Sequence, residues 1–355
     1  MLKALGVHIY AGGFTLGMRQ HFEILGQLES TAFGAATVRR NMPEVPVFVG
    51  KESWPKASYL REAGVDLVYA NPPCAIWSIA NSRSSHDGWK TDPRTRDTED
   101  FFDLVAELQP KVAVVESVPR SLTVGKEFYE SHAARLLEQG YAVTSAVTNA
   151  QFHGVPQDRR RVFFVAHKVD LDFRLAEPRS TTVGEALTQS GEPRWNNPIP
   201  EKWSDLVRQT PQGSQARAVY FGLNPDARSG PGNRLRRPAL AGLCPIPTGW
   251  PELIHPTEHR HLDPVELQAL SGYPRDYYFV AKNGVEHVYQ LNRAVLPPVG
   301  EWIAGLVARG LDQGIPCLPV RRYIDVTIGG GIPREVMSEV AATAHPKGGM
   351  EDVGE

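Results

Sequence analysis

The stretch Asp66-Leu-Val-Tyr-Ala-Asn-Pro-Pro-Cys74 is the most informative about the fold, because an apolar strand runs directly into a stiff loop. The apolar residues fit a buried strand, and the two prolines that follow fix the direction of the chain. The loop presents a cysteine at the carboxyl end of a strand, which is where open α/β sheets bind their ligands. Taken alone, the segment is equally compatible with a small buried thiol, the usual environment of a free cysteine.

Short β-branched runs alternate with longer helical stretches through the first half of the chain. This alternation predicts an α/β fold with a doubly wound, mostly parallel, Rossmann-like sheet that carries helices on both faces. The expected strands are residues 5–10, 45–49, 66–70, 112–116, 142–148 and 161–166. The expected crossover helices are residues 31–41, 56–63, 96–108 and 126–139.

The texture changes after about residue 170, where Pro, Gly and Arg become frequent and periodicity is lost. We therefore expect a first α/β part, a small loop-rich region, a return segment that packs on the first part, and a C-terminal extension. Their boundaries are residues 1–178, 179–256, 257–312 and 313–355. Helices are expected again at residues 263–270 and at about 299–309, whereas the chain from about residue 314 resembles an appendage or a frayed tail.

The composition, 41% hydrophobic and 22% charged, is that of a globular protein. No window approaches the roughly 18 uncharged apolar residues that a membrane span needs, and the N-terminus lacks a signal-peptide pattern. We therefore expect a cytoplasmic protein without membrane association. Cys74, Cys244 and Cys317 form no Cys-x-x-Cys pair, so neither a disulfide framework nor a metal site is expected.

The formal net charge of −2 provides no overall attraction to nucleic acid, so such binding would need a local patch. Residues 193–240 supply one, because eight Lys and Arg residues stand there against three acids, a local balance of +5.

Two further stretches carry candidate catalytic residues. Val112-Ala-Val-Val-Glu116 reads as a buried strand that ends on a carboxylate, which is costly unless the group is paired or functional. In Gly154-Val-Pro-Gln-Asp-Arg-Arg-Arg-Val-Phe163, alternation along the strand places Arg159 and Arg161 on one face. Taken alone, the first stretch also fits a strand that ends on a solvent-exposed carboxylate, and the second also fits a solvated basic loop.

Residues near the N-terminus indicate a nucleotide-like ligand. Gly12 and Gly13 follow the first expected strand, where missing side chains let the backbone approach a ligand. Glu29 lies roughly 20 residues further on and is placed to accept hydrogen bonds from ribose hydroxyls, unless it is an exposed acid at a strand end.

In combination and in this order, Pro-Pro-Cys, Glu-x-Val and Gln-x-Arg-x-Arg resemble the motifs of the C5-cytosine-specific DNA methyltransferase family. The glycine-rich stretch at residues 10–17 and Gln290-Leu-Asn-Arg-Ala-Val-Leu-Pro-Pro298 are similar to further motifs of that family, and the resemblance spans roughly residues 5–311. It implies methyl transfer from S-adenosyl-L-methionine to C5 of a cytosine flipped out of double-stranded DNA. Residues 179–256 would then form a small target-recognition domain.

The chemistry gives each catalytic candidate a role. C5 of cytosine is too weak a nucleophile to take a methyl group directly, so the Cys74 thiolate would first add to C6. Addition pushes electron density toward N3, where a protonated Glu116, its pKa raised by burial, would stabilise the adduct. The resemblance assigns Arg161 to the base O2 and the sugar–phosphate, and Arg159 to support of the Cys74 loop. A stacked base is out of reach, which is why flipping is required.

The resemblance also implies binding residues. For the cofactor they are Tyr10, Ala11, Gly12, Gly13, Glu29, Asn71, Pro73, Asn292 and Val295, with Tyr10 as a stacking ring. For nucleic acid they are Gln157, Arg234, Arg236 and Arg237. The chain departs from the family pattern at Gly50-Lys-Glu52, which leaves Glu52 or Asp66 to read the adenine amino group, and at Asn292-Arg293, where the family has Gly-Asn.

Two alternative functions remain open. A related enzyme could methylate cytosine in RNA, because a small recognition region suits a pre-formed loop whose base is already unstacked. A catalytically inactive homologue could bind DNA, although retention of Cys74, Glu116, Arg159 and Arg161 argues against that. A monomer is expected, either partnered with a cognate restriction enzyme or acting without one.

Overall fold

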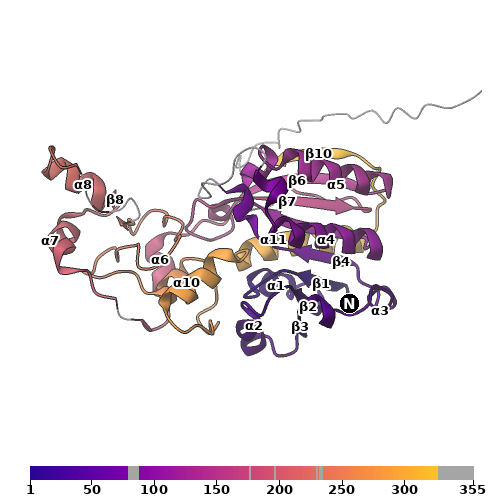
Figure 1. Ribbon diagram of the computed structural model, residues 1–355, viewed down its shortest axis with the longest axis horizontal. Coiled ribbons are helices and arrows are strands. Elements are labelled where there is room, and N and C mark those ends of the chain that lie inside the picture. The colour runs from indigo at the N-terminus through magenta and orange to yellow at the C-terminus, as the bar shows by residue number, and fades with distance from the viewer. Residues whose placement is uncertain (79–87, 176, 196, 229–230, 232–234, 327–355) are drawn as a thin grey trace, which may run out of the picture.

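The computed structural model describes residues 1–78, 88–175, 177–195, 197–228, 231 and 235–326. A large α/β body and a smaller lobe lie side by side along the long axis of the molecule (Figure 1). Within the described ranges, no helix combines the length and the apolar character that crossing a bilayer requires.

The body is built on one eight-stranded sheet with the order β10-β6-β7-β5-β4-β1-β2-β3. The pairings are parallel except for those of β7, which runs antiparallel to both β5 and β6. This confirms the predicted mostly parallel sheet. The strands are β1 (Lys3–Val7), β2 (Glu23–Glu29), β3 (Val47–Val49), β4 (Leu67–Ala70), β5 (Val112–Ser117), β6 (Ala142–Asn149), β7 (Arg160–His167) and β10 (Arg321–Asp325).

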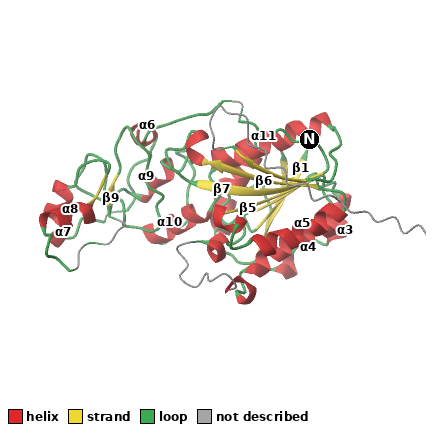
Figure 2. Ribbon diagram, turned by 90° about the horizontal axis from the view of Figure 1, so that it is seen from above, coloured by secondary structure: helices red, strands yellow, loops and turns green. Residues whose placement is uncertain are grey.

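Helices cover both faces of this sheet, so the doubly wound architecture is confirmed (Figure 2). On one face α1 and α11 bury Phe14 and Ile303 in a core with β1, β4 and β5. On the other face α3, α4 and α5 bury Leu60, Phe101 and Phe128. The bounds are α1 (Gly13–Met18), α2 (Ala35–Asn41), α3 (Ala57–Glu62), α4 (Thr95–Leu108), α5 (Lys126–Glu138) and α11 (Pro297–Gln313).

The register of the parallel strands positions the candidate site. Ala70 of β4 pairs with both Val7 of β1 and Val115 of β5, so these three strands end at the same edge of the sheet. Residues that follow each of these strands therefore converge there. The loops at this and other strand ends contain short 3-10 helices, which in the described part are η1 (Lys51–Ser53), η2 (Cys74–Trp77), η3 (Gly88–Thr91), η4 (Pro119–Leu122) and η5 (Ala150–Phe152).

Two segments of the sheet were not expected from the sequence. Strand β2 was missed, and the expectation of an appendage after residue 314 is wrong for residues 321–325, because β10 pairs in parallel with β6 at the sheet edge. The strand is short and begins with two arginines, features typical of an edge strand and easily taken for a surface tail.

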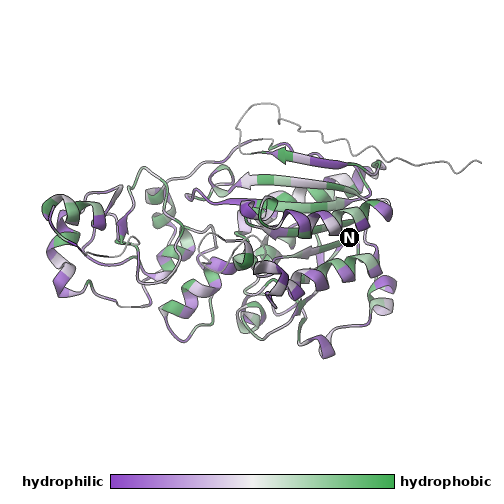
Figure 3. Cartoon of the chain, turned by 45° about the horizontal axis from the view of Figure 1, so that its top comes forward, coloured by the Kyte–Doolittle hydropathy of each residue, from purple (hydrophilic) through white to green (hydrophobic). Residues whose placement is uncertain are grey.

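The smaller lobe draws on both the predicted loop-rich region and the return segment. Val183 and Ala186 pack in one core with Leu267 and Leu291, so residues on either side of the expected boundary at 256 share a hydrophobic cluster. Figure 3 shows hydrophobic and hydrophilic residues intermixed through this lobe. Its elements are α6 (Val183–Thr188), α7 (Glu201–Gln209), β8 (Ser214–Gln215), α8 (Ala216–Leu223), β9 (Arg236–Arg237), α9 (Pro264–Ala269) and α10 (Gly284–Arg293).

Helix α9 confirms the helix expected at residues 263–270 and shows why it starts there. The Asp263 side chain accepts from the backbone of Val265, and the Glu266 side chain accepts from the backbone of Asp263, which together make a capping box. Arg260 then forms a two-point ion pair with Glu266, with both N–O distances below 3 Å. This network orders the segment that leads back to the body.

The glycines of the first loop serve packing against the return segment. Gly12 has a left-handed backbone (φ 80°), which favours glycine. A Cβ atom on Gly13 would come within 2.5 Å of the Val295 carbonyl oxygen and closer still to the Tyr273 hydroxyl. The expectation that Gly13 leaves space for a ligand is therefore corrected, because protein atoms fill that space.

Candidate active site

Cys74 and Glu116 project from the ends of the neighbouring strands β4 and β5. Cys74 is half-buried and is the first residue of the 3-10 helix η2. Glu116 is 2% exposed and is the next-to-last residue of strand β5. Asn71, the first residue after β4, donates from Nδ2 to Oε2 of Glu116 over 2.8 Å. The Asn-Pro-Pro-Cys loop is thus joined to the carboxylate on the next strand.

The two arginines of the Gln-x-Arg-x-Arg motif reach the same place, Arg161 from β7 and Arg159 from the residue just before that strand. Arg161 Nε lies 2.7 Å from Oε1 of Glu116, which makes a largely buried ion pair. Arg159 is 4% exposed, and both arginines line one small cavity together with Glu116 and Val295. The prediction that Arg159 and Arg161 share a face is confirmed.

Arg159 makes contacts that the sequence did not indicate. Its Nη2 donates to the backbone oxygens of Asn292 and Ala294, at 3.0 Å each. These hydrogen bonds therefore hold residues 290–298, here called the closing motif, in place. Among the described residues, Arg159 acts on Cys74 through its charge. Burial lowers the pKa of Arg159 to about 9, so it stays cationic at neutral pH.

The pKa values of the acid and the thiol are set by opposing causes. Burial raises the pKa of Glu116, against the lowering effect of Arg161, Arg159 and Asn71. Burial also raises the pKa of Cys74, and the charge of Glu116 adds to this effect while the two arginines oppose it. The sequence prediction of a raised Glu116 pKa therefore agrees with the burial that the structure provides.

A second group of candidate residues surrounds the end of β1. Oε1 of Glu29 accepts hydrogen bonds from the backbone amides of Ile9 and Tyr10, at 2.8 and 3.2 Å. Burial raises the pKa of Glu29 to about 8. Tyr10 has a left-handed backbone (φ 60°) and packs edge-on against Phe33 at 6.0 Å between ring centroids.

These residues fit a nucleoside cofactor by their chemistry. Oδ1 atoms of Asn71 and Asn292 are buried and have no hydrogen-bond partner in the described part of the chain, so each remains available to a donor group. Pro73, Val295 and the ring of Tyr10 add apolar surface, and Glu29 adds a carboxyl group. A mainly apolar site with a few placed polar groups is typical of small-molecule binding. The Ala11 carbonyl, by contrast, is already taken by the hydroxyl of Tyr277.

Two residues predicted to contact nucleic acid lie inside the protein. Gln157 is 0% exposed, and its Nε2 donates to the Leu270 carbonyl at 2.8 Å. Arg237 is 7% exposed and donates to four backbone carbonyl oxygens, among them that of Val207 at 2.8 Å. These placements correct the prediction, because in a loop-rich lobe the guanidinium and amide donors satisfy buried carbonyls. Arg236 is half-buried in β9, and Arg234 lies outside the described residues.

The two acids considered for adenine recognition are placed differently from each other. Asp66 lies at the start of β4, where it accepts from the Lys3 amide at 3.1 Å and from Lys111 Nζ at 2.9 Å. This is the amino end of β4, opposite the site at the carboxyl ends of the strands. Asp66 is therefore excluded as the residue that reads the adenine amino group. Glu52 is exposed in η1. The structure instead brings His8 and Asp97 beside the Tyr10 loop, and no sequence motif marked either residue.

The fold and this arrangement define a Rossmann-like methyltransferase. A model of the C-5 cytosine-specific DNA methylase family matches residues 7–210. The chain belongs to that family and is a DNA cytosine-5 methyltransferase. Use of S-adenosyl-L-methionine follows in general terms from membership.

Curated relatives and solved structures agree with this assignment. The type II methyltransferase M.AquIA of Picosynechococcus sp. is 31% identical over 192 residues, which are 50% of this chain and 76% of the relative. M1.HphI of Haemophilus parahaemolyticus is 27% identical over 325 residues, 84% of each chain. Among solved structures, a prophage-encoded E. coli protein described as a DNA modification methyltransferase has a TM-score of 0.64 at 21% identity, over 88% of this chain and 100% of its own. The S. pombe Dnmt2 methyltransferase has a TM-score of 0.61 at 13% identity, over 88% and 100%, and these two likenesses show the fold.

Proposed function

We propose that this enzyme methylates C5 of a cytosine flipped out of double-stranded DNA, through a covalent bond between Cys74 and C6 of the base. The observation that carries the proposal is the contact of Glu116 with both Asn71 and Arg161 beside the Cys74 loop, at the ligand-binding edge of the sheet. A thiol and a buried carboxyl group at this edge are the two groups that the addition step needs.

In the first step the Cys74 thiolate forms a bond to C6, and the electron pair of the C5–C6 double bond is displaced through the ring toward N3. Glu116, in its protonated form, donates a proton to N3 and so keeps negative charge from accumulating on the base. Its raised pKa supports this role, since the protonated form persists to higher pH than for an exposed carboxyl group.

Protonation of Glu116 would favour the thiolate form of Cys74. Two guanidinium groups, of Arg159 and Arg161, face two acidic groups in a site where burial opposes ionisation of either. When Glu116 is neutral, it no longer raises the pKa of Cys74. The thiolate is then the one acidic group of the pair that the two arginines stabilise. Proton uptake by Glu116 would therefore leave both arginines to stabilise negative charge on the Cys74 sulfur.

When bound, S-adenosyl-L-methionine supplies the electrophilic methyl group. After transfer the cofactor would leave as S-adenosyl-L-homocysteine. Loss of the C5 proton to a base would then return an electron pair to the ring and expel the Cys74 thiolate, while Glu116 would recover its proton from N3. On the protein side, Glu29 would bind the ribose hydroxyls, Tyr10 would stack, and the free Oδ1 atoms of Asn71 and Asn292 would accept from amino groups.

The smaller lobe would read the target sequence. Residues 193–240 hold the local balance of +5, although Arg237 is committed to the interior of the lobe. The contacts to phosphate would therefore fall to the more exposed cations, such as Lys202 and Arg208. We further propose a monomeric enzyme, and the likeness to type II methyltransferases supports an association with a cognate restriction enzyme.

The test is transfer of tritium from labelled S-adenosyl-L-methionine to double-stranded DNA and to RNA in parallel reactions. Label in DNA, with bisulfite sequencing that places it at one sequence context, is the expected result. Label in RNA alone would support the alternative substrate, and no label in either would support an inactive homologue.

A further inference from the structure

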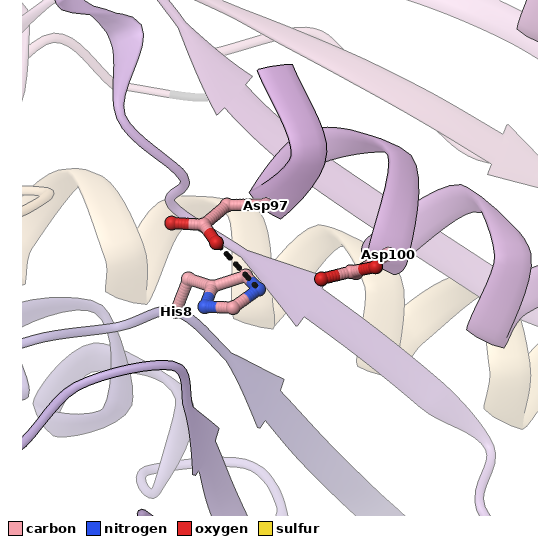
Figure 4. Close-up of side chains that lie close together, drawn as sticks. All are labelled: His8, Asp97 and Asp100. Atoms are coloured by element: carbon pink, nitrogen blue, oxygen red, sulfur yellow. Dashed lines mark ion pairs between the residues drawn. The ribbon is translucent and has the colours of Figure 1, made fainter. Parts of the chain in front are cut away.

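A cluster of three side chains lies beside the first loop, on the face of the sheet covered by α4 (Figure 4). His8 follows β1, while Asp97 and Asp100 lie three residues apart on α4 and so project from one side of that helix. One ligand-type atom from each residue lies within 4.8 Å of the others. The His8 Nε2 to Asp97 Oδ1 distance is 3.9 Å, which is too long for a hydrogen bond.

The imidazole of His8 also indicates a ligand at this cluster. The residue is 1% exposed, and its Nε2 atom has no hydrogen-bond partner among the described residues. An imidazole nitrogen is the commonest metal ligand in proteins. The backbone of His8 is left-handed (φ 55°), an uncommon conformation for a residue other than glycine, and this conformation turns the ring toward α4.

The donor atoms match the spacing around a divalent ion. Metal–ligand distances of roughly 2.0–2.2 Å place two ligands at most about 4.4 Å apart. The 3.9 Å between His8 Nε2 and Asp97 Oδ1 satisfies this limit, and the ligand atom of Asp100 lies no more than 4.8 Å from the other two. One nitrogen and two carboxylate oxygens suit ions such as Mn²⁺, Co²⁺ or Zn²⁺.

Cations of the protein already surround the cluster. Lys51 Nζ contacts Asp100 Oδ2, and Arg96 Nε lies 3.1 Å from Asp100 Oδ1. Lys51 is about half-exposed, so its ion pair contributes little to stability and its ammonium group is able to move into solvent. Among the described residues Asp97 accepts one weak hydrogen bond, from the Ser30 hydroxyl at 3.4 Å, and the ring centroid of Trp54 lies 5.6 Å from that of His8.

We propose that His8, Asp97 and Asp100 bind one divalent ion, such as Mn²⁺, Co²⁺ or Zn²⁺. The ion would displace the Lys51 ammonium group from Asp100. The site is separate from Cys74 and Glu116, and its occupancy is measured without cofactor or DNA. Because His8 is next to Ile9, whose amide holds Glu29, the ion would fix the loop on the cofactor side of β1.

The experiment is a titration of the chelator-treated, 355-residue protein with Mn²⁺. Binding is measured as the loss of the electron paramagnetic resonance signal of the free ion. Mn²⁺ is the probe because thiols such as Cys74 are poor ligands for it. We expect one ion per chain. His8→Asn, chosen because asparagine tolerates a left-handed backbone, and Asp97→Asn should each weaken binding at least tenfold. Lys51→Met should tighten it severalfold, because the competing ammonium is gone.

His259→Asn is the matched control, since His259 lies in the smaller lobe, where its Nε2 pairs with Ser204. This variant should bind Mn²⁺ like the wild type. The proposal is overturned if neither wild type nor Lys51→Met binds a stoichiometric ion, or if His8→Asn and Asp97→Asn bind as tightly as the wild type. Circular dichroism of each variant confirms that weakened binding does not reflect unfolding.

Discussion

Arg161 and Glu116 form an ion pair in which Nε lies 2.7 Å from Oε1, and Asn71 donates to the second oxygen of the same carboxyl group. Asn71 follows β4 and Arg161 lies on β7, the two strands that flank β5. The carboxyl group is therefore held from both sides, which fixes its orientation before a base arrives.

Replacement of Glu116 with Gln should lower kcat by about 10²–10⁴-fold, because the amide keeps the size of the side chain but cannot transfer a proton to N3. The pH dependence is the sharper readout. Since burial raises the Glu116 pKa, wild-type activity should persist above the ordinary carboxyl range and fall as pH rises through that raised value. The alkaline fall attributable to Glu116 should vanish in the variant. An unchanged pH profile in Glu116→Gln, with Glu107→Gln as an exposed control, would remove the proton-donor role.

Replacement of Cys74 with Ser should abolish turnover while cofactor binding persists. At neutral pH an alkoxide is far scarcer than a thiolate, so addition to C6 is lost. Calorimetry with S-adenosyl-L-homocysteine measures binding separately from the tritium assay. Cys317→Ser, which changes another half-buried thiol, should retain activity. Methyl transfer by the Cys74 variant would show that another residue is the nucleophile.

A duplex that contains 5-fluorocytosine at the target position should trap the wild-type enzyme. Fluorine at C5 blocks the elimination that frees Cys74, so the protein–DNA bond survives denaturing electrophoresis. Peptide mapping of the trapped species should place the link on Cys74. Failure to observe a shifted band under conditions that support turnover on ordinary DNA would count against the covalent route.

Replacement of Arg237 with Ala should destabilise the smaller lobe by roughly 2–4 kcal/mol, because several buried carbonyl groups lose a charged donor. Arg208→Ala is the matched control. Arg208 is exposed and pairs only with nearby Asp205 among the described residues, so this change should stay within about 0.5 kcal/mol. Thermal denaturation measures both. Equal, small effects would indicate that Arg237 is not a structural residue.

Glu29 should make stability depend on pH in the absence of cofactor. Its folded pKa of about 8 lies above the ordinary value of 4.5, so the folded state holds a proton that the unfolded state releases. The associated stability is fully present below pH 4.5 and is lost as pH rises through about 8, by at most about 5 kcal/mol. Glu29→Gln should remove this slope in denaturant titrations at several pH values. An identical slope in the variant would contradict the raised pKa.

Much of the fold followed from local patterns in the sequence. Each of the six expected strands corresponds to a strand of the sheet, because alternating or continuous apolar runs report burial directly. Strand β2 escaped notice since Gly26 and polar residues interrupt it, and β10 since its two leading arginines fit an edge. The order of the strands is also beyond local patterns, because it depends on pairings between residues far apart in the chain.

For the site, the sequence by itself determined which residue types end the strands: Cys74 after β4, Glu116 in β5 and the arginines beside β7. Only the tertiary structure decided their partners. The antiparallel insertion of β7 next to β5 brings Arg161 to Glu116 and directs Arg159 to the closing motif. The tertiary structure likewise buries Gln157 and Arg237, and it leaves His8 Nε2 without a hydrogen-bond partner among the described residues. A motif specifies the residues at the end of one strand, whereas burial and pairing arise only when neighbouring elements, distant in sequence, remove those groups from water.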